Sequence, residues 1–135
     1  MIAAQAVLRA VHAALVADAE LVALLGGARV HEFVPARARP PYISLAIVAV
    51  RDWSTATEGG AEVEMSVTTW SEASRLDPLA AIQARVAAAV AFERLAVAEH
   101  ALVNLTALDT TIERRPADDL LVARQAFRIV CEPDL

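Results

Sequence analysis

A cysteine and three histidines are the side chains in this sequence that could supply a nucleophile and its base. The thiol belongs to Cys131, and the imidazoles belong to His12, His31 and His100. Cys131 shares one face of a predicted strand with Phe127, where a buried and inert thiol is typical. The histidines lie far apart in the sequence and lack the spacing of metal ligands. We therefore predict neither a catalytic cysteine nor a metal site.

Two nearby carboxylates suggest a different chemistry, general acid–base catalysis. Glu62 and Glu64 alternate on one face of a predicted strand, about 7 Å apart from the rise of a strand, and that separation suits such a pair. A solvated strand face explains them more simply. Phosphate-binding, hydrolase and zinc-protease motifs are missing from the sequence, in which Gly26-Gly27 and Gly59-Gly60 are isolated pairs. The sequence thus predicts no enzyme and no cofactor.

Residues that could contact a partner lie in two places. A predicted hairpin tip carries Trp53, which either folds back onto its own core or anchors a partner, because tryptophan is enriched in interface hot spots. Two neighbouring predicted strands carry arginines that either present a basic strip to an acidic partner or pair with glutamates across the sheet. Those glutamates are Glu62, Glu64 and Glu132. The candidate interface residues are Asp52, Trp53, Ser54, Thr55, Glu58, Arg114, Arg124 and Arg128. A second tryptophan, Trp70, is predicted to pack in the core.

The secondary structure that positions these residues is predicted to start with helices at the N-terminus. Apolar residues recur at helical spacing from Ala4 to Leu15. Asp18 can cap a second short helix that Gly26-Gly27 ends, and a single helix bent near Asp18 is the alternative. Three prolines make the stretch from Ala28 to Pro41 an extended arm or a surface loop.

Two strands, a helix and two further strands are predicted next. The almost wholly apolar run from Tyr42 to Val50 favours a strand covered on both faces, and the alternation from Glu62 to Thr69 indicates a half-exposed strand. Asp77 and Pro78 fit the cap and first residue of a helix that runs to Phe92 or Leu95. The last strands are expected at Leu102 to Leu108 and Thr110 to Arg114, with a bulge or bend near Asp109, and at Leu121 to Glu132. The order α-(α)-β-β-α-β-β predicts an α+β fold, in which an antiparallel or mixed β-sheet has α-helices packed on one face.

Length and composition limit the class of protein. The 135 residues fit one domain, residues 1–135, and the 57% of hydrophobic residues excludes a disordered chain. The longest uncharged stretch, Pro40 to Val50, is too short for a membrane span, and the N-terminus lacks the features of a signal peptide. The single cysteine suits a reducing compartment. The net charge of −5 argues against a protein that binds a nucleic-acid backbone.

An ordered set of short segments resembles a known family. They are Leu24 to Val30, Pro35 to Ile43, Asp52 to Thr55, Val67 to Ser71, His100 to Leu105 and Phe127 to Pro133. Their order and spacing are similar to the tail completion (tail terminator) family of long-tailed phages, in the version found in gene transfer agents and prophages of GC-rich alphaproteobacteria. The sequence departs from the family pattern at Glu99, where a glycine and a tight turn are expected.

The resemblance implies a structural, non-enzymatic role at the head–tail joint of a phage or gene transfer agent particle made in the bacterial cytoplasm. Family members form a ring, usually a hexamer, that caps the tail tube, stops its polymerisation and provides the docking surface for the head connector. The implied partners are further copies of the chain, the tail tube protein and the head connector or stopper protein, with no cofactor and no membrane. DNA would pass through the channel without specific binding, because a negative chain repels phosphates over a Debye length of about 8 Å.

Two other classes of protein stay open. Another neck protein, such as a stopper or a head–tail adaptor, would share the small size and the lack of a catalytic motif. The second class is a small ligand-binding or enzymatic domain, which a tight ligand or metal in native mass spectrometry would support.

Overall fold

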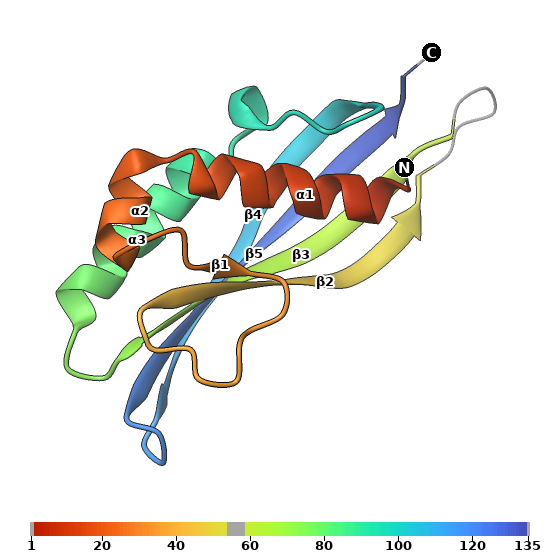
Figure 1. Cartoon of the computed structure of the whole chain (residues 1–135). Coiled ribbons are helices and arrows are strands. Elements are labelled where there is room, and N and C mark those ends of the chain that lie inside the picture. The colour runs from red at the N-terminus through yellow and green to blue at the C-terminus, as the bar shows by residue number, and fades with distance from the viewer. Residues whose placement is uncertain (1, 54–58, 135) are drawn as a thin grey trace.

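The computed structural model describes residues 2–53 and 59–134, and it places helices on one face of a five-stranded sheet (Figure 1). The helices are α1 (Ala3–Val16), α2 (Ala19–Leu25) and α3 (Leu76–Ala89), with a short 3-10 helix η1 (Phe92–Arg94). The strands are β1 (Val30–His31), β2 (Tyr42–Asp52), β3 (Ala61–Glu72), β4 (His100–Arg115) and β5 (Leu120–Pro133). Their order is β1-β2-β3-β5-β4, with β1 parallel to β2 and the other neighbours antiparallel. The predicted α+β fold is confirmed.

The core lies between the helices and one face of the sheet. Alternate residues of β3 point to this face, and Val63, Met65 and Val67 are fully buried there. The stripe predicted for α3, which includes Ile82 and Val86, is buried against the same core. The opposite face of the sheet, here called the open face, has no helix over it among the described residues.

Two separate helices form at the N-terminus, and Asp18 divides them. Its carboxylate accepts a hydrogen bond of 2.9 Å from the backbone amide of Leu21 and so caps α2. Gly26 ends α2 with a φ of 77°, a left-handed conformation that glycine adopts without strain. The interpretation with two helices is therefore the correct one.

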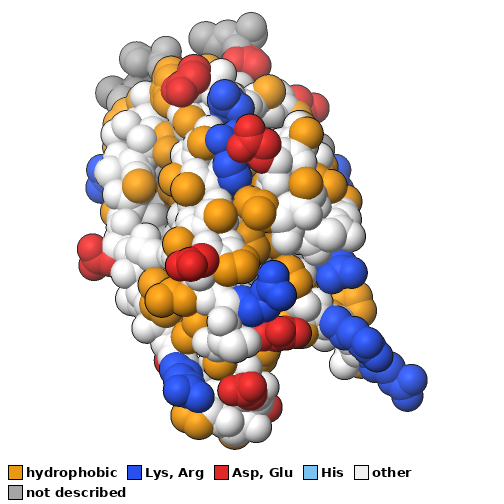
Figure 2. All heavy atoms as spheres, turned by 90° about the vertical axis from the view of Figure 1, so that its left-hand side faces the viewer, with side chains coloured by type: hydrophobic (Ala, Val, Ile, Leu, Met, Phe, Trp, Pro, Cys, Tyr) orange, Lys and Arg blue, Asp and Glu red, His pale blue; other side chains and the backbone are white. Residues whose placement is uncertain are grey.

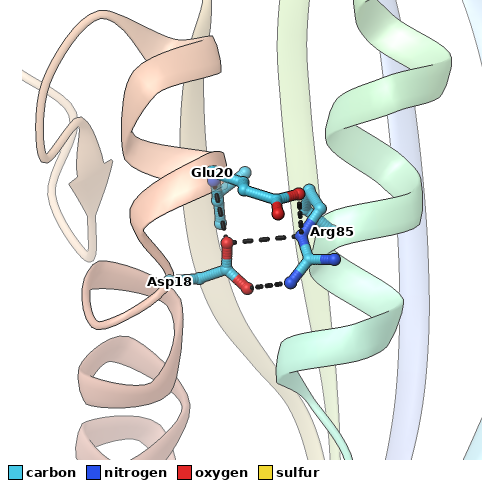
Figure 3. Close-up of polar contacts among 4 residues, drawn as sticks. Asp18, Glu20 and Arg85 are labelled. Atoms are coloured by element: carbon cyan, nitrogen blue, oxygen red, sulfur yellow. Dashed lines mark hydrogen bonds and ion pairs between the residues drawn. The ribbon is translucent and has the colours of Figure 1, made fainter.

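Asp18 also joins α2 to α3 (Figure 3). Its carboxylate accepts two hydrogen bonds from the guanidinium of Arg85, with donor–acceptor distances of 2.6 and 3.3 Å. Glu20 lies 3.5 Å from the same guanidinium but is mostly exposed. The bonds from Arg85 lower the pKa of Asp18 despite its burial, which acts in the opposite direction. The Asp18 carboxylate thus caps α2 and links it to α3.

The structure corrects two expectations about single elements. β2 is not covered on both faces, because Ala46, which is level with Ser66, is exposed on the open face. Near the end of the strand, Val48 and Val50 are also 44% and 53% exposed. The helix α3 begins one residue before Asp77, and Asp77 is in its first turn instead of at the cap. Pro78 is tolerated there because the first-turn amides have no partner within the helix. The helix ends at Ala89, before Phe92.

The hairpin of β4 and β5 is the longest element pair. The predicted irregularity near Asp109 is confirmed by a register shift between Ala107 and Thr110. Beyond this bulge the second half of β4 is exposed, and the hairpin extends past the helices at the lower end of Figure 1. Nowhere in residues 2–53 and 59–134 is there a helix long and apolar enough to cross a membrane.

Candidate partner interface

Charged side chains pair with one another on the open face. Arg51 on β2 lies 3.1 Å from Glu62 and 3.6 Å from Glu64 on β3. On the other side of β3, Arg128 of β5 lies 3.7 Å from Glu62. The pairing of Arg128 with a glutamate across the sheet is therefore confirmed. The two glutamates face a guanidinium, and this arrangement resembles a strand-surface ion network more than an acid–base pair.

An aromatic stack occupies the other end of the open face. The rings of Tyr42 and Trp70 are stacked at 5.9 Å and 15°, and the indole nitrogen of Trp70 donates a 2.9 Å hydrogen bond to Ser44. The guanidinium of Arg115 lies 5.5 Å from the centre of the Trp70 ring. Trp70 is therefore not in the core. The alternation of β3 places it with Glu62 on the face that the helices leave uncovered.

The remaining predicted arginines differ from one another in their surroundings. Arg114 is 3.8 Å from Asp119, in the turn that joins β4 to β5. Its neighbour Arg115 is 3.6 Å from Asp118 in the same turn. These two pairs were not predicted. The sequence does contain the signal for them, because two arginines end β4 and two aspartates follow in the turn directly after it. Arg124 is exposed on β5 and makes no ion pair with any residue in the described ranges.

Trp53 follows β2 at the opposite end of the sheet, directly after Asp52. The residue is 42% exposed, and its backbone amide donates a 2.9 Å hydrogen bond to the carbonyl of Gly60. A Cβ atom at Gly60 would lie 3.1 Å from the ring, so the glycine lets the indole lie against the start of β3. One part of the indole thus packs against its own chain, and the other part is exposed and could contact a partner. The predicted interface residues Ser54, Thr55 and Glu58 lie outside the described residues.

Asp52 and Trp53 lie at one end of the sheet and Arg114 at the other, with Arg124 and Arg128 at levels between them. Asp52 pairs with Ala61, which is level with Cys131 on β5, whereas Arg114 is level with Leu121. Roughly 30 Å of strand separates these levels. The structure therefore keeps Asp52 and Trp53 far from Arg114.

Cys131 is fully buried, and its surroundings argue against catalysis. It lines a hollow of about 230 Å³ that His100 also lines. The Nδ1 atom of His100 lies 2.7 Å from the Ala98 carbonyl, and burial raises the pKa of the Cys131 thiol. A raised pKa disfavours the thiolate that a nucleophile needs. No group of three or more potential metal ligands occurs within the described part of the chain.

Sequence reasoning missed a basic hollow beside β1. Residues 32–41, here called the arm, connect β1 to β2. Arg37 and Arg39 of the arm, together with Arg29, line a hollow of about 260 Å³ against Tyr42. Figure 2 shows arginine side chains that project at the lower right of the face seen from α2 and α3. The three prolines that made this stretch look like a plain loop gave no sign of the hollow.

The tight turn before β4 forms even though Glu99 stands where glycine is expected. Glu99 has a φ of 64°, and the amide of His100 donates a 3.2 Å hydrogen bond to the carbonyl of Val97. This is the turn position at which a positive φ favours glycine. The departure in sequence is therefore not a departure in backbone conformation.

Comparisons with known proteins agree with this architecture. The family model described as Tail completion protein gp17 matches residues 9–132. Among solved structures, the chain is similar to a chain of the "Virion of native gene transfer agent (GTA) particle", with 30% identity and a TM-score of 0.86. That match covers 96% of this chain and 97% of the other. No curated protein matches. The chain belongs to the family of tail completion protein gp17, and it is a structural, non-enzymatic protein of a phage-like tail.

Proposed function

We propose that copies of this chain form a hexameric ring that caps the tail tube, ends its polymerisation and provides the docking surface for the head connector. The observation that carries the proposal is the match to a gene transfer agent virion chain over nearly the full length of both chains. The match covers 96% of this chain and 97% of the other, so it extends over nearly the whole of both. Membership of the tail completion family supports the same role.

The distribution of exposed groups suits a ring that lies between two different partners. The half-exposed indole of Trp53 lies at one end of the sheet, and Arg114 and the β4–β5 turn lie at the other. A tube and a connector differ in structure, so a protein between them needs two unlike docking surfaces. We propose that Asp52 and Trp53 belong to one of these surfaces and Arg114 to the other, with Arg124 and Arg128 on the open face between them.

A strand-rich sheet also distinguishes this role from one alternative. A head–tail adaptor is expected to be mostly helical, whereas β2, β3, β4 and β5 form most of the regular structure here. A stopper is typically rich in strands, so the experiment must separate a stopper from a terminator. Only a terminator acts on the growing tube.

The direct test adds the purified chain to polymerising tail tube protein and measures tube length by electron microscopy. We expect shorter tubes as the ratio of chain to tube protein rises, with gold-labelled chain at one tube end. A variant of an exposed α1 residue, Gln5→Ala, is the matched control and should act like the native chain. Tubes of unchanged length, or label along their sides, would contradict the proposed capping role.

A further inference from the structure

Two exposed regions lie at the same level on opposite edges of the sheet. The pairing register joins Val30 of β1 to Ile43, then to Thr69 and Ala123, and finally to Ile112 of β4. The outer half of β4 is therefore level with β1 and the arm that follows it. Copies related by rotation about an axis parallel to the strands, without translation, would bring these two edges together.

The β4 edge, defined as residues 108–113, carries apolar and acidic side chains. Leu108 and Ile112 are 37% and 53% exposed, and Asp109 and Glu113 are exposed beside them. β4 is the last strand of the sheet, so its outer backbone has no strand partner within the described residues. A long exposed edge of this kind readily pairs with another chain unless something covers it.

The arm on the opposite edge carries apolar side chains, two arginines and one acidic residue, Glu32. Phe33 is 90% exposed and Val34 is 40% exposed. Arg37 and Arg39 are exposed as well, and neither makes an ion pair with another described residue. The arm therefore has the apolar groups and the opposite charge that the β4 edge would need in a partner.

We propose that the β4 edge of one copy packs against the arm of the next copy, and that this contact repeats around the ring. Asp109 and Glu113 then face Arg37 and Arg39, and the apolar side chains of the two regions cover one another. Arg114 and Arg115 lie beside the turn aspartates Asp118 and Asp119 and do not cancel this acidic charge, whereas Arg124 lines a hollow with Asp109 and offsets part of it. The inference rests on the proposed ring and names the surfaces that close it.

Charge reversal on each side tests the contact. One variant carries Arg37→Glu and Arg39→Glu, a second carries Asp109→Arg and Glu113→Arg, and a third carries all four changes. Like charges facing each other should weaken association of the first two by about tenfold or more. The third variant should recover most of the native association, because its charges are again opposite. Sedimentation velocity of the purified chains measures the assembly.

Several results would overturn the inference. The charge contact would be refuted if either double variant assembled like the native chain. It would also be refuted if the variant with all four changes associated no more strongly than the double variants. A native chain that stays monomeric at every concentration would refute it as well. Circular dichroism should be unchanged in all variants, because every altered residue is exposed, and Arg9→Glu on α1 is the matched charge control.

Nucleic acid is the competing ligand for the arginines of the arm. If Arg37→Glu and Arg39→Glu leave assembly intact but abolish retention of double-stranded DNA at low salt, the arm serves DNA and the inference is wrong. The terminator role is judged separately by tube length. If the charge-reversal variants assemble and cap tubes like the native chain, the proposed contact is wrong but the terminator role stands.

Discussion

At the scale of single residues, Asp18 does more than any other carboxylate in the described chain to shape the fold. It caps α2, and it accepts two hydrogen bonds from Arg85 of α3 while almost fully buried. A residue that ends one helix and contacts another couples the formation of the two. The sequence predicted the cap from the type of residue and its position. It could not predict Arg85, because that contact spans much of the chain.

Replacement of Asp18 should therefore destabilise the protein. Loss of the cap alone lowers the free energy of unfolding by about 1 kcal/mol, and Asp18→Ala also leaves the Arg85 guanidinium without its closest partner. Urea unfolding measures the change. Glu20→Ala is the control, because Glu20 is mostly exposed and touches the same arginine. An Asp18→Ala variant as stable as Glu20→Ala would contradict this role.

The ion pair of Asp18 with Arg85 should also make the stability of the protein depend on pH. The bonds from Arg85 lower the pKa of Asp18 in the folded state, so the folded protein binds fewer protons at this group than the unfolded chain does. The stabilisation is then complete above the ordinary aspartate pKa of about 3.9, and it is lost as the pH falls through the lowered value. The stability difference between the native chain and Asp18→Asn should shrink only below about pH 4. A difference that does not change with pH would argue against the ion pair.

Glu99 gives a second test at this scale. A left-handed φ costs a side chain about 1 kcal/mol relative to glycine. Glu99→Gly and Glu99→Ala both remove the carboxylate, but only the glycine relieves the backbone. We expect Glu99→Gly to be the more stable of the two by about that amount in thermal or urea unfolding. Equal stabilities would mean that the turn does not strain residue 99.

At the scale of elements, periodicity predicted which residues of β3 and α3 are buried, and it did not predict what covers the second face of β2. Alternation reports that one face of a strand is apolar. A strand that is apolar on both faces can be covered by the same chain or by a partner, and Ala46 is exposed on the open face here. The misplacement of Trp70 has the same origin, since burial by stacking on Tyr42 is not visible in the sequence.

The two tryptophans should respond differently to truncation. Trp53 is half-exposed after β2, whereas Trp70 stacks on Tyr42 and bonds to Ser44. Trp53→Ala should leave the monomer folded and weaken assembly by about 2 kcal/mol or more. Trp70→Ala should instead lower the stability of the monomer by at least about 1 kcal/mol. Circular dichroism and sedimentation on both variants separate the effects, and an unfolded Trp53→Ala would assign that side chain to the core.

At the scale of the whole molecule, the chain has a net charge of −5, and several of its arginines are already paired. Arg51 and Arg128 face glutamates on the open face, and Arg114 and Arg115 face turn aspartates. Two of the remaining arginines, Arg37 and Arg39, lie in the arm, and Arg29 lines the same hollow. Such a surface suits contacts between protein copies more than a grip on DNA, whose backbone requires a basic face.

Composition and the order of segments indicated the class of protein, whereas the pairing of the strands determined where the candidate interface residues lie. The overall fold and the family could be predicted, because both depend on the order of elements along the chain. The division of the candidate interface between two ends of the sheet could not, because it depends on the register of β3 against β5. The arm and the β4 edge also needed the structure, since their equal level follows from pairings across all five strands.

Electron microscopy of particles from cells that lack this gene would test the terminator role without any purified component. We expect complete heads beside unattached tails of abnormal and variable length, with normal particles restored by the native gene. Tails of normal length would contradict the terminator role. If such tails also failed to join heads, the chain would be another component of the neck.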